Sequence, residues 1–375
     1  MKIAIIVRVL WPGGVQRIAI AEARGLNKLG HQTDLIFVRN TGRFRYQIDT
    51  PFKILYGPEI INRPFGRLLR FITMLYSPQR GSDATVDIDL IRNAERYVST
   101  RYDVIYYFDE FSAFFSSISR KKGKKKIVLI HEVYLDDGSY LQRFIQKMAL
   151  KNADLILTNT KYNLCKLNEA GYRNTHEIFP GLIPIDGVPP FNLRKNIALS
   201  VTMWDFGRRP EVLVEIAKQL STGKIVLCGD WTDHDYMQKT KEKIVEMKLS
   251  NKIEITGPLT ESELVSYYKE AKAAVRFGYN EKGPGMGSLE AISWGIPLII
   301  NNEIGAREIV DEEECGFIVD EEDSSGVASI LEELFTNEAM WNDLSRISLK
   351  TASKYTWELH NEKLSDLVEN LGKVK

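Results

Sequence analysis

The chain has little cysteine, little histidine and no long run of apolar residues. Its 375 residues include three cysteines and five histidines. Cys165, Cys228 and Cys315 are far apart and odd in number, which argues against a disulfide framework and against a zinc site, so we expect plain core residues. No apolar stretch reaches the roughly 18 residues that cross a membrane, and the opening MKIAIIVRVLWPGG has neither the length nor the cleavage site of a signal peptide. We therefore expect a cytoplasmic protein.

The common ligand-binding motifs are absent as well. The glycine-rich stretch GPGMGS at 283–288 lacks the Gly-Lys-Ser/Thr ending of a P-loop and does not follow the first strand, so neither an ATPase nor a dehydrogenase is indicated. The acidic triplet DID at 87–89 precedes a helix and is no convincing metal site. The basic run RKKGKKK at 120–126 has no interleaved aromatic residues, so we expect no nucleic acid partner.

Net charge is zero overall but is divided unevenly along the chain. Residues 1–185 hold 28 Lys and Arg against 17 Asp and Glu, and the remainder holds 22 against 33. A basic first half predicts an anionic partner for that half. Arg63, Arg67 and Arg70 recur at helical spacing beside apolar residues, which suits a helix on an anionic membrane surface. The alternative that stays open is a solvated face above a core stripe.

Strands and helices alternate along both halves of the chain. A domain of about 150 residues is typical, so the length predicts two domains. Apolar runs buried on both faces predict strands of a parallel sheet. In the first half these are 2–9, 33–38, 103–108, 126–131 and 153–159, with a helix over 15–29. In the second half they are 196–202, 224–230, 251–257, 273–278 and 296–302, with helices over 210–220 and 260–271.

Prolines at 180, 184, 189 and 190 predict a linker between the two series. The predicted fold class is therefore α/β, with two Rossmann-like doubly wound domains facing across a cleft. Ligands of such folds bind at the carboxyl ends of the strands.

The glycine-rich stretch leads directly into a helix, which gives it a chemical meaning. Glycines let the backbone approach a ligand closely, and the free N–H groups of Met286, Gly287 and Ser288 at a helix start suit phosphate oxygens. Glu290, further along the helix, would lie within reach of the paired hydroxyls of a sugar. The alternative is a helix start whose acidic residue only complements the helix dipole.

Several further segments match one known family. WPGGVQRIAIAEARGLNKLGH (11–31), VLIHEVY (128–134), ADLILTNTKYNLCKL (153–167), SLEAISWGIPLIINNEIGAREIVDEEECGFIVDEED (288–323) and KYTWELHNEKL (354–364) resemble the family-4 retaining glycosyltransferases of the GT-B fold, glycosyl transferases group 1. The resemblance runs from the first strand to the last helix. It implies an acceptor-binding domain over 1–183, a linker over 184–195, a nucleotide-sugar-binding domain over 196–352 and a terminal helix, 353–375, that crosses back to the first domain.

The resemblance also implies roles for residues at the donor site. Glu290 would bind the ribose of the nucleotide, and Arg208 stands where the family has a lysine that binds the diphosphate. An arginine there still neutralises the charge that develops on the leaving group. The implied donor-binding residues are Gly13, Gly14, Arg208, Glu281, Lys282, Gly285, Met286, Gly287, Ser288 and Glu290.

Three residues of the first domain complete the implied site. His131 would line the sugar subsite and act in catalysis with Arg208 and Lys282, offering its imidazole to a sugar hydroxyl or its carbonyl to the oxocarbenium-like centre. Asp109 and Glu110 follow a strand and would meet the acceptor. A structural histidine and a merely charged loop are the alternatives.

Retaining enzymes of this kind are thought to need no nucleophile of their own, because the leaving diphosphate accepts the acceptor's proton on the same face. The absence of an obvious carboxylate pair of the glycosidase kind agrees with this mechanism. The resemblance thus implies a nucleotide-sugar substrate, no cofactor and no metal. The basic first domain favours an anionic or lipid-linked acceptor, with peripheral contact at the inner face of a membrane.

Two departures from the family pattern leave alternatives open. Family members carry two glutamates separated by seven residues, and counting back from Glu290 places Lys282 at the first, with Glu281 one residue away. Thr202 and Met203 stand where a glycine and a basic residue are usual. The second hypothesis is therefore an inactive GT-B pseudoenzyme that binds a partner or a membrane. An epimerase or a phosphorylase is less favoured, because the former needs a carboxylate-rich cleft and the latter a longer chain.

Overall fold

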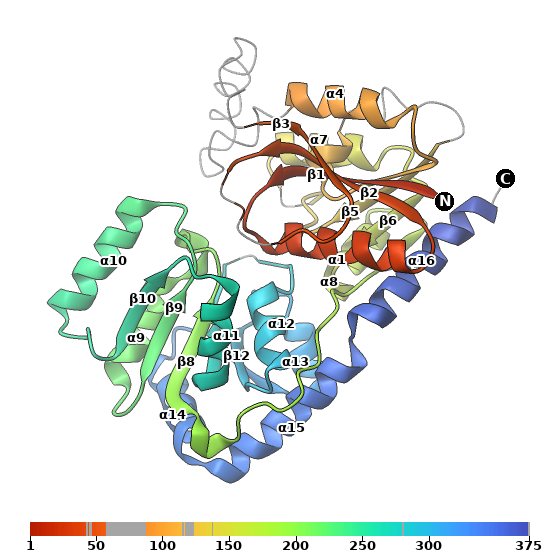
Figure 1. Cartoon of the computed structure of the whole chain (residues 1–375). Coiled ribbons are helices and arrows are strands. Elements are labelled where there is room, and N and C mark those ends of the chain that lie inside the picture. The colour runs from red at the N-terminus through yellow and green to blue at the C-terminus, as the bar shows by residue number, and fades with distance from the viewer. Residues whose placement is uncertain are drawn as a thin grey trace. The chain divides into compact units, whose positions relative to one another are not determined.

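A computed structural model describes residues 1–42, 44, 47–57, 88–114, 116, 124–136, 138–279 and 281–373. The chain forms two compact units (Figure 1). Unit 1 combines Met1–Pro180 with Trp357–Lys375, and unit 2 is Gly181–Thr356. The expected surface helix around Arg63, Arg67 and Arg70, the DID aspartate at 87 and the first four residues of the basic run at 120–126 lie outside the described residues.

Unit 1 is built on a seven-stranded parallel sheet with the order β3-β2-β1-β4-β5-β6-β7. Its central strands are buried on both faces, as the uninterrupted apolar runs predict. Because the order reverses between β1 and β4, this is the switch point of the sheet. The strands are β1 (Lys2–Leu10), β2 (Gln32–Asn40), β3 (Phe52–Tyr56), β4 (Val104–Tyr107), β5 (Lys125–Ile130), β6 (Leu155–Thr158) and β7 (Thr175–Glu177).

Helices cover both faces of this sheet, with α4 on one side and α1 on the other (Figure 1). The terminal helix α16 packs along α1. The two cross closely at Gly25, where a Cβ would lie 2.0 Å from Cγ of Asn361. His360 of α16 joins the buried Glu22 of α1 at 3.1 Å. The helices are α1 (Gly14–Lys28), α4 (Ile88–Val98), α5 (Glu110–Ala113), α7 (Tyr140–Leu150), α8 (Lys161–Glu169) and α16 (Trp357–Lys373).

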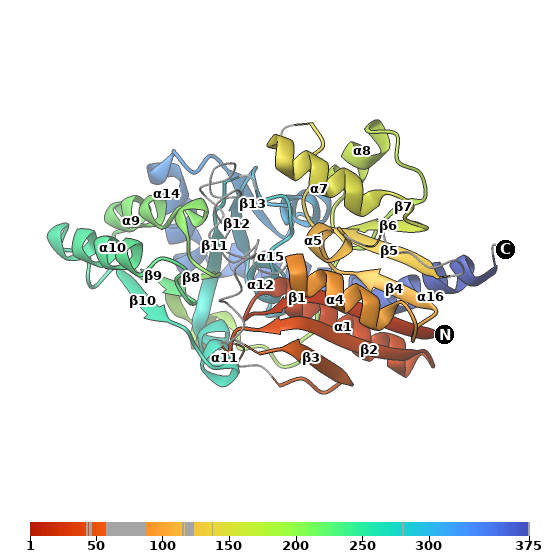
Figure 2. The ribbon, with the colours of Figure 1, turned by 90° about the horizontal axis from the view of Figure 1, so that it is seen from above.

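Unit 2 repeats the arrangement with a six-stranded parallel sheet in the order β10-β9-β8-β11-β12-β13. The switch point here lies between β8 and β11, which become neighbours although two strands separate them in sequence. Figure 2 shows the strands of this sheet from above. They are β8 (Lys195–Val201), β9 (Lys224–Cys228), β10 (Ile253–Gly257), β11 (Ala271–Arg276), β12 (Leu298–Asn301) and β13 (Gly316–Val319).

A large core forms where α9 and α14 pack on this sheet, around Trp204, Trp231 and Trp341. The short η2 (Phe191–Leu193) precedes β8, and η3 (Phe206–Arg208) follows it. The other helices are α9 (Pro210–Gln219), α10 (His234–Glu246), α11 (Glu261–Glu270), α12 (Met286–Ser293), α13 (Arg307–Glu313), α14 (Ser324–Thr336) and α15 (Glu338–Lys354). Among the cysteines, Cys228 and Cys315 are buried, but Cys165 is exposed, so the expectation of a core residue was wrong for Cys165.

The predicted fold class, two doubly wound α/β units, is confirmed. The ten predicted strands match β1, β2, β4, β5, β6 and β8 to β12 with small shifts at their ends. The strands β3, β7 and β13 were not predicted from the sequence. These are short strands with partly exposed residues, so they lack the apolar run that reveals a buried strand.

Candidate functional site

The switch point of unit 2 gathers charged side chains at one edge of its sheet. Arg208 and Arg209 follow β8, Glu281 and Lys282 follow β11, and Glu303 follows β12. All these strands are parallel, so the residues that follow them share the carboxyl edge. This is the edge at which sheets of this order bind ligands.

The glycine-rich stretch forms the start of α12 as predicted. Gly285 adopts the positive φ of 68° and caps the helix, a conformation that favours glycine. Gly287 lies so close to β8 that a Cβ would come within 2.3 Å of the Val201 carbonyl oxygen. Of the three amides expected to be free, that of Ser288 donates to the Gly285 carbonyl at 3.0 Å, so this expectation was wrong for Ser288. The amides of Met286 and Gly287 have no acceptor within the described part of the chain.

Glu281 lies between two arginines beside this helix start. Its Oε2 atom accepts from Arg276 Nη2 at 2.6 Å and pairs with Arg208 Nη1. The other oxygen, Oε1, has no hydrogen-bond partner among the described residues and lies 3.9 Å from where a Cβ of Gly285 would be. Arg276 is only 4% exposed, and burial lowers its pKa to about 10 although Glu281 acts in the opposite direction. Arg208, Arg276 and Glu281 together carry one net positive charge, and the half-exposed Asp205 lies 3.9 Å from Arg208 Nε.

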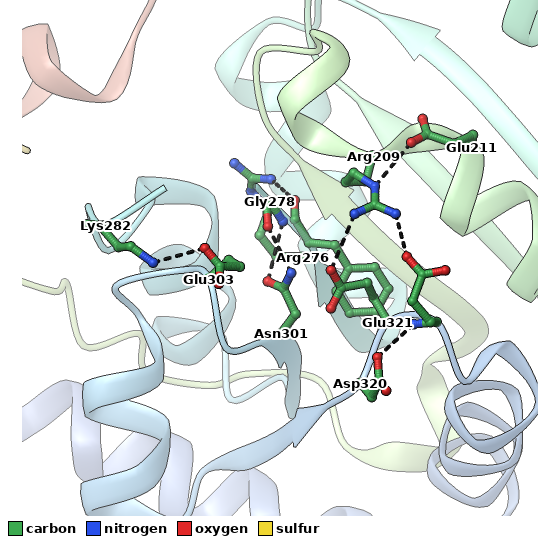
Figure 3. Close-up of polar contacts among 11 residues, drawn as sticks. Arg209, Glu211, Arg276, Gly278, Lys282, Asn301, Glu303, Asp320 and Glu321 are labelled. Carbon is green, nitrogen blue, oxygen red and sulfur yellow. Dashed lines mark hydrogen bonds and ion pairs between the residues drawn. The ribbon is translucent and has the colours of Figure 1, made fainter. Parts of the chain in front are cut away.

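Lys282, one residue further on, is turned to another partner. Its Nζ atom pairs with Glu303 Oε2 at 2.9 Å (Figure 3). The loop is held to β12 by Asn301, whose amide donates to the Gly278 carbonyl at 2.8 Å. Lys282 therefore does not take the glutamate's place in the arginine cluster. The structure gives that place to Glu281, nine positions before Glu290.

Glu290 lies half-buried on α12, four residues past its first residue. Its Oε2 atom accepts from the hydroxyl of Tyr268 at 2.8 Å. The Tyr268 ring is buried and stacks on Trp294, with the ring planes 9° apart. The carboxylate is thus held in one orientation by a rigid neighbour.

Arg209 has a left-handed conformation, with φ at 54°, immediately before Pro210. Its guanidinium meets Glu211 at 3.2 Å, Glu321 at 3.5 Å and Glu322 at 2.7 Å (Figure 3). These pairs fix the turn from which Arg208 projects. The hydrogen bond to Glu322 is the main reason why the pKa of Arg209 is raised.

In unit 1 the candidate residues also follow the strands beside the switch point. Gly13 caps α1 with an extended φ of −120°, and Gly14 is the first helical residue. A Cβ on Gly13 would lie 2.8 Å from Oε1 of Gln16. That glutamine donates to the Val9 carbonyl at 2.8 Å, so the loop and the strand end are tied together.

His131 follows β5 and is fully occupied by its own unit. Its Nε2 atom bonds the Phe108 carbonyl at 2.9 Å, and its Nδ1 atom meets Asn159 Nδ2 at 2.8 Å. These partners require a neutral ring with the proton on Nε2. Asn163 donates to the His131 carbonyl at 2.8 Å. The pKa of His131 is lowered, chiefly by burial, while the Phe108 carbonyl and Asp109 act in the opposite direction.

Asp109 serves as a helix cap. Its carboxylate accepts from the Ser112 amide at 2.7 Å and from the Ser112 hydroxyl at 3.0 Å. Glu110 is 8% exposed. Capping of α5 therefore accounts for Asp109 without any ligand.

Three residues that contact the predicted site residues were not predicted from the sequence: Arg276, Asn159 and Asn163. Arg276 lies within the predicted apolar strand 273–278. A charged residue in that apolar run was the only feature that could have indicated a functional role. No group of His, Cys, Asp or Glu arranged to hold a metal ion occurs among the described residues. Within the same ranges, no helix is both long and apolar enough to cross a membrane.

Two doubly wound α/β units are the architecture of the GT-B glycosyltransferases. The profile described as Glycosyl transferases group 1 matches residues 185–351, and that of Glycosyltransferase Family 4 matches residues 12–183. The chain belongs to this family of glycosyltransferases.

Similar proteins agree with this assignment. D-inositol 3-phosphate glycosyltransferase of Corynebacterium urealyticum is 24% identical over 64% of this chain and 62% of its own length, so the alignment spans less than two thirds of that relative. Sucrose-phosphate synthase from Thermosynechococcus elongatus superposes with a TM-score of 0.80 at 18% identity, covering all of both chains. Anabaena HepE in complex with UDP-glucose gives 0.75 at 17% identity, again over both whole chains.

Proposed function

We propose that the protein is a retaining glycosyltransferase that moves a sugar from a nucleotide-diphosphate-sugar donor to a hydroxyl of a glycan or a lipid-linked acceptor. The observation that supports this most is the cluster of Arg208, Glu281 and Arg276 beside the open amino end of α12. Positive charge and unoccupied amides are what a diphosphate requires. The UDP-glucose bound to Anabaena HepE supports a nucleotide-sugar donor.

The geometry of unit 2 supports the following donor roles. The amides of Met286 and Gly287 and the guanidinium of Arg208 bind the diphosphate, and Glu290 binds the ribose. Glu281, in place of Lys282, offers Oε1 to a hydroxyl of the transferred sugar, since both arginines bind its Oε2. Lys282 neutralises the charge of Glu303 at the edge of the loop.

The residues of unit 1 have a more limited role in this proposal. Gly13 and Gly14 approach the donor diphosphate through the start of α1. Because both ring nitrogens of His131 are used, its part in the sugar subsite falls to its carbonyl oxygen, which has a second lone pair beside the bond from Asn163. Asp109 and Glu110 remain predicted acceptor contacts.

Retention follows if the leaving diphosphate acts as the base. The bond from the anomeric carbon to the phosphate oxygen breaks, and a bond to the acceptor oxygen forms on the same face. The acceptor's proton passes to the released phosphate oxygen, and Arg208 stabilises the charge that develops there. This route needs neither a metal nor a cofactor, so we expect full activity in the presence of EDTA.

We further propose that unit 1 carries the acceptor and contacts the inner face of a membrane from the cytoplasm. The excess of basic residues in the first half supports an anionic or lipid-linked acceptor. The double substitution Arg67→Glu and Arg70→Glu would then reduce co-sedimentation with anionic vesicles. Equal sedimentation of variant and parent would remove the membrane part of the proposal.

Donor hydrolysis and transfer should be measured with UDP-, GDP- and ADP-sugars, and the anomeric configuration of the product read by NMR. We expect one donor class to react, with retention, and Glu290→Ala to weaken its binding. Inversion would contradict the mechanism. Binding without any turnover would support the pseudoenzyme alternative, and a failure of every nucleotide sugar to bind would end the enzyme assignment.

A further inference from the structure

Arg276 is a buried cation at the end of a central strand. It is the last residue of β11, and its side chain is only 4% exposed. Its Nη1 atom donates to the carbonyl of Phe277, and its Nη2 atom donates to Glu281. A charge buried this deeply is costly unless it is paired. Among the described residues its single ion-pair partner is Glu281, and the charges of Arg208 and Asp205 act on it from further away.

The shape of the pairing is unusual. Arg276 Nη2 and Arg208 Nη1 both meet the same oxygen of Glu281, Oε2. The Arg276 side chain is 4% exposed, whereas that of Arg208 is 24% exposed. If Arg208 alone faced Glu281, the pair would be neutral. With Arg276 present, the charge of Glu281 is compensated by a buried partner, and Arg208, Arg276 and Glu281 together keep one positive charge. A second carboxylate near Arg208 is that of Asp205, which is 47% exposed and lies 3.9 Å from Arg208 Nε.

We propose that Arg276 is a positioning residue that holds Glu281 in place and frees the charge of Arg208 for an anionic donor. When Arg208 turns its guanidinium toward a phosphate oxygen, Arg276 remains on Oε2, so Glu281 does not become an unpaired buried charge. Arg276 itself does not touch the donor. This inference rests on the proposed function of the site.

Arg276→Met removes the compensating charge, and Arg276→Lys restores it with a shorter side chain. The matched control is Lys272→Met. Lys272 is a buried cation on the same strand, 7% exposed, and its Nζ atom bonds Asn196 and the Phe335 carbonyl, away from the cluster. Loss of a buried cation from β11 is thus common to both variants. Only Arg276→Met changes the charge of the cluster.

The probe is whichever of UDP, GDP and ADP binds the parent protein most tightly, compared with its monophosphate by calorimetry. We expect Arg276→Met to weaken the diphosphate tenfold or more and the monophosphate less than threefold. Arg276→Lys should recover part of the loss, and Lys272→Met should bind both as the parent does. Adding Glu281→Gln to Arg276→Met should restore part of the diphosphate affinity, because the uncompensated carboxylate is then gone.

Equal diphosphate affinity in Arg276→Met and the parent would overturn the inference, as would effects of Arg276→Met and Glu281→Gln that simply add. If Arg276→Met does not fold, Arg276→Gln, which is also neutral, replaces it in the same comparison. A diphosphate affinity of Arg276→Gln equal to that of the parent would likewise overturn the inference. If the parent binds no nucleoside diphosphate, the proposed function fails first, and the inference fails with it.

Discussion

A methyl group at Gly287 would press the start of α12 away from β8. The added Cβ would lie 2.3 Å from the Val201 carbonyl oxygen and 3.0 Å from the Val201 Cβ, whereas ordinary contact begins at 3.4 Å. The backbone must therefore move by about 1 Å, which typically costs about 1–3 kcal/mol for an overpacked site. The same movement displaces the amides of Met286 and Gly287. A misplacement of about 1 Å in an active site costs on the order of 100-fold in enzyme rate, and we expect a loss of similar size in diphosphate affinity.

The assay combines urea unfolding with calorimetric titration of UDP, GDP and ADP for the parent and Gly287→Ala. Gly283→Ala is the matched control, because a Cβ there meets no atom within 4 Å and lies in the same loop. We expect Gly287→Ala to lose stability and about 100-fold in diphosphate affinity, and Gly283→Ala to change neither beyond about 0.5 kcal/mol.

The loss of diphosphate affinity in Gly287→Ala must be larger than its loss of folding stability alone would cause. If Gly287→Ala unfolds earlier in urea but binds the diphosphate as the parent does, the start of α12 does not hold the phosphates. If Gly287→Ala is as stable as the parent, the contact with Val201 is less tight than the structure has it.

Three further outcomes are expected. Gly25→Ala should destabilise unit 1 by about 1–3 kcal/mol in urea unfolding, because its Cβ would meet the buried Asn361. The double variant Gly25→Ala and Asn361→Ala should lose less stability than the sum of the two single variants. Additive losses would argue against the close crossing of α1 and α16. Arg209→Ala and Arg209→Gly both lose the glutamate pairs, but only glycine adopts the left-handed backbone conformation without strain. The glycine variant should therefore be the more stable of the two by about 1 kcal/mol. Equal stabilities would show that the backbone at residue 209 is not strained. Burial lowers the pKa of His131 below its ordinary 6.5, so the unfolded chain binds the proton more readily and stability should fall as the pH drops below 6.5. Melting temperatures across this range should fall less for His131→Asn than for the parent. Parallel curves for the two proteins would refute the half-buried neutral ring.

The sequence predicts the architecture well because the physics of buried parallel strands is local. Each central strand must be apolar on both faces, and that pattern is visible in KIAIIVRV or KIVLC without knowledge of the partners. The edge strands lack this pattern. β3 has no fully buried residue, so its place in the sheet depends on pairing with β2, which a local pattern does not reveal.

The site could be predicted only in part. The glycines and Glu290 carry their meaning in the local pattern of a loop that enters a helix. Which of Glu281 and Lys282 faces the arginines depends on the loop's direction, fixed by the bridge between Glu281 and Ile304. The role of Asp109 depends on a helix of only four residues, α5, for which its carboxylate is the cap.

The central claim is that the edge of unit 2 around Arg208 and α12 binds the diphosphate of a nucleotide-sugar donor. Its most direct test is calorimetric titration of UDP, GDP and ADP into the parent protein and into Arg208→Gln. We expect at least one nucleoside diphosphate to bind the parent, and to bind Arg208→Gln tenfold or more weakly. Equal binding by the variant, or no binding of any of the three to the parent at millimolar concentration, would contradict the claim.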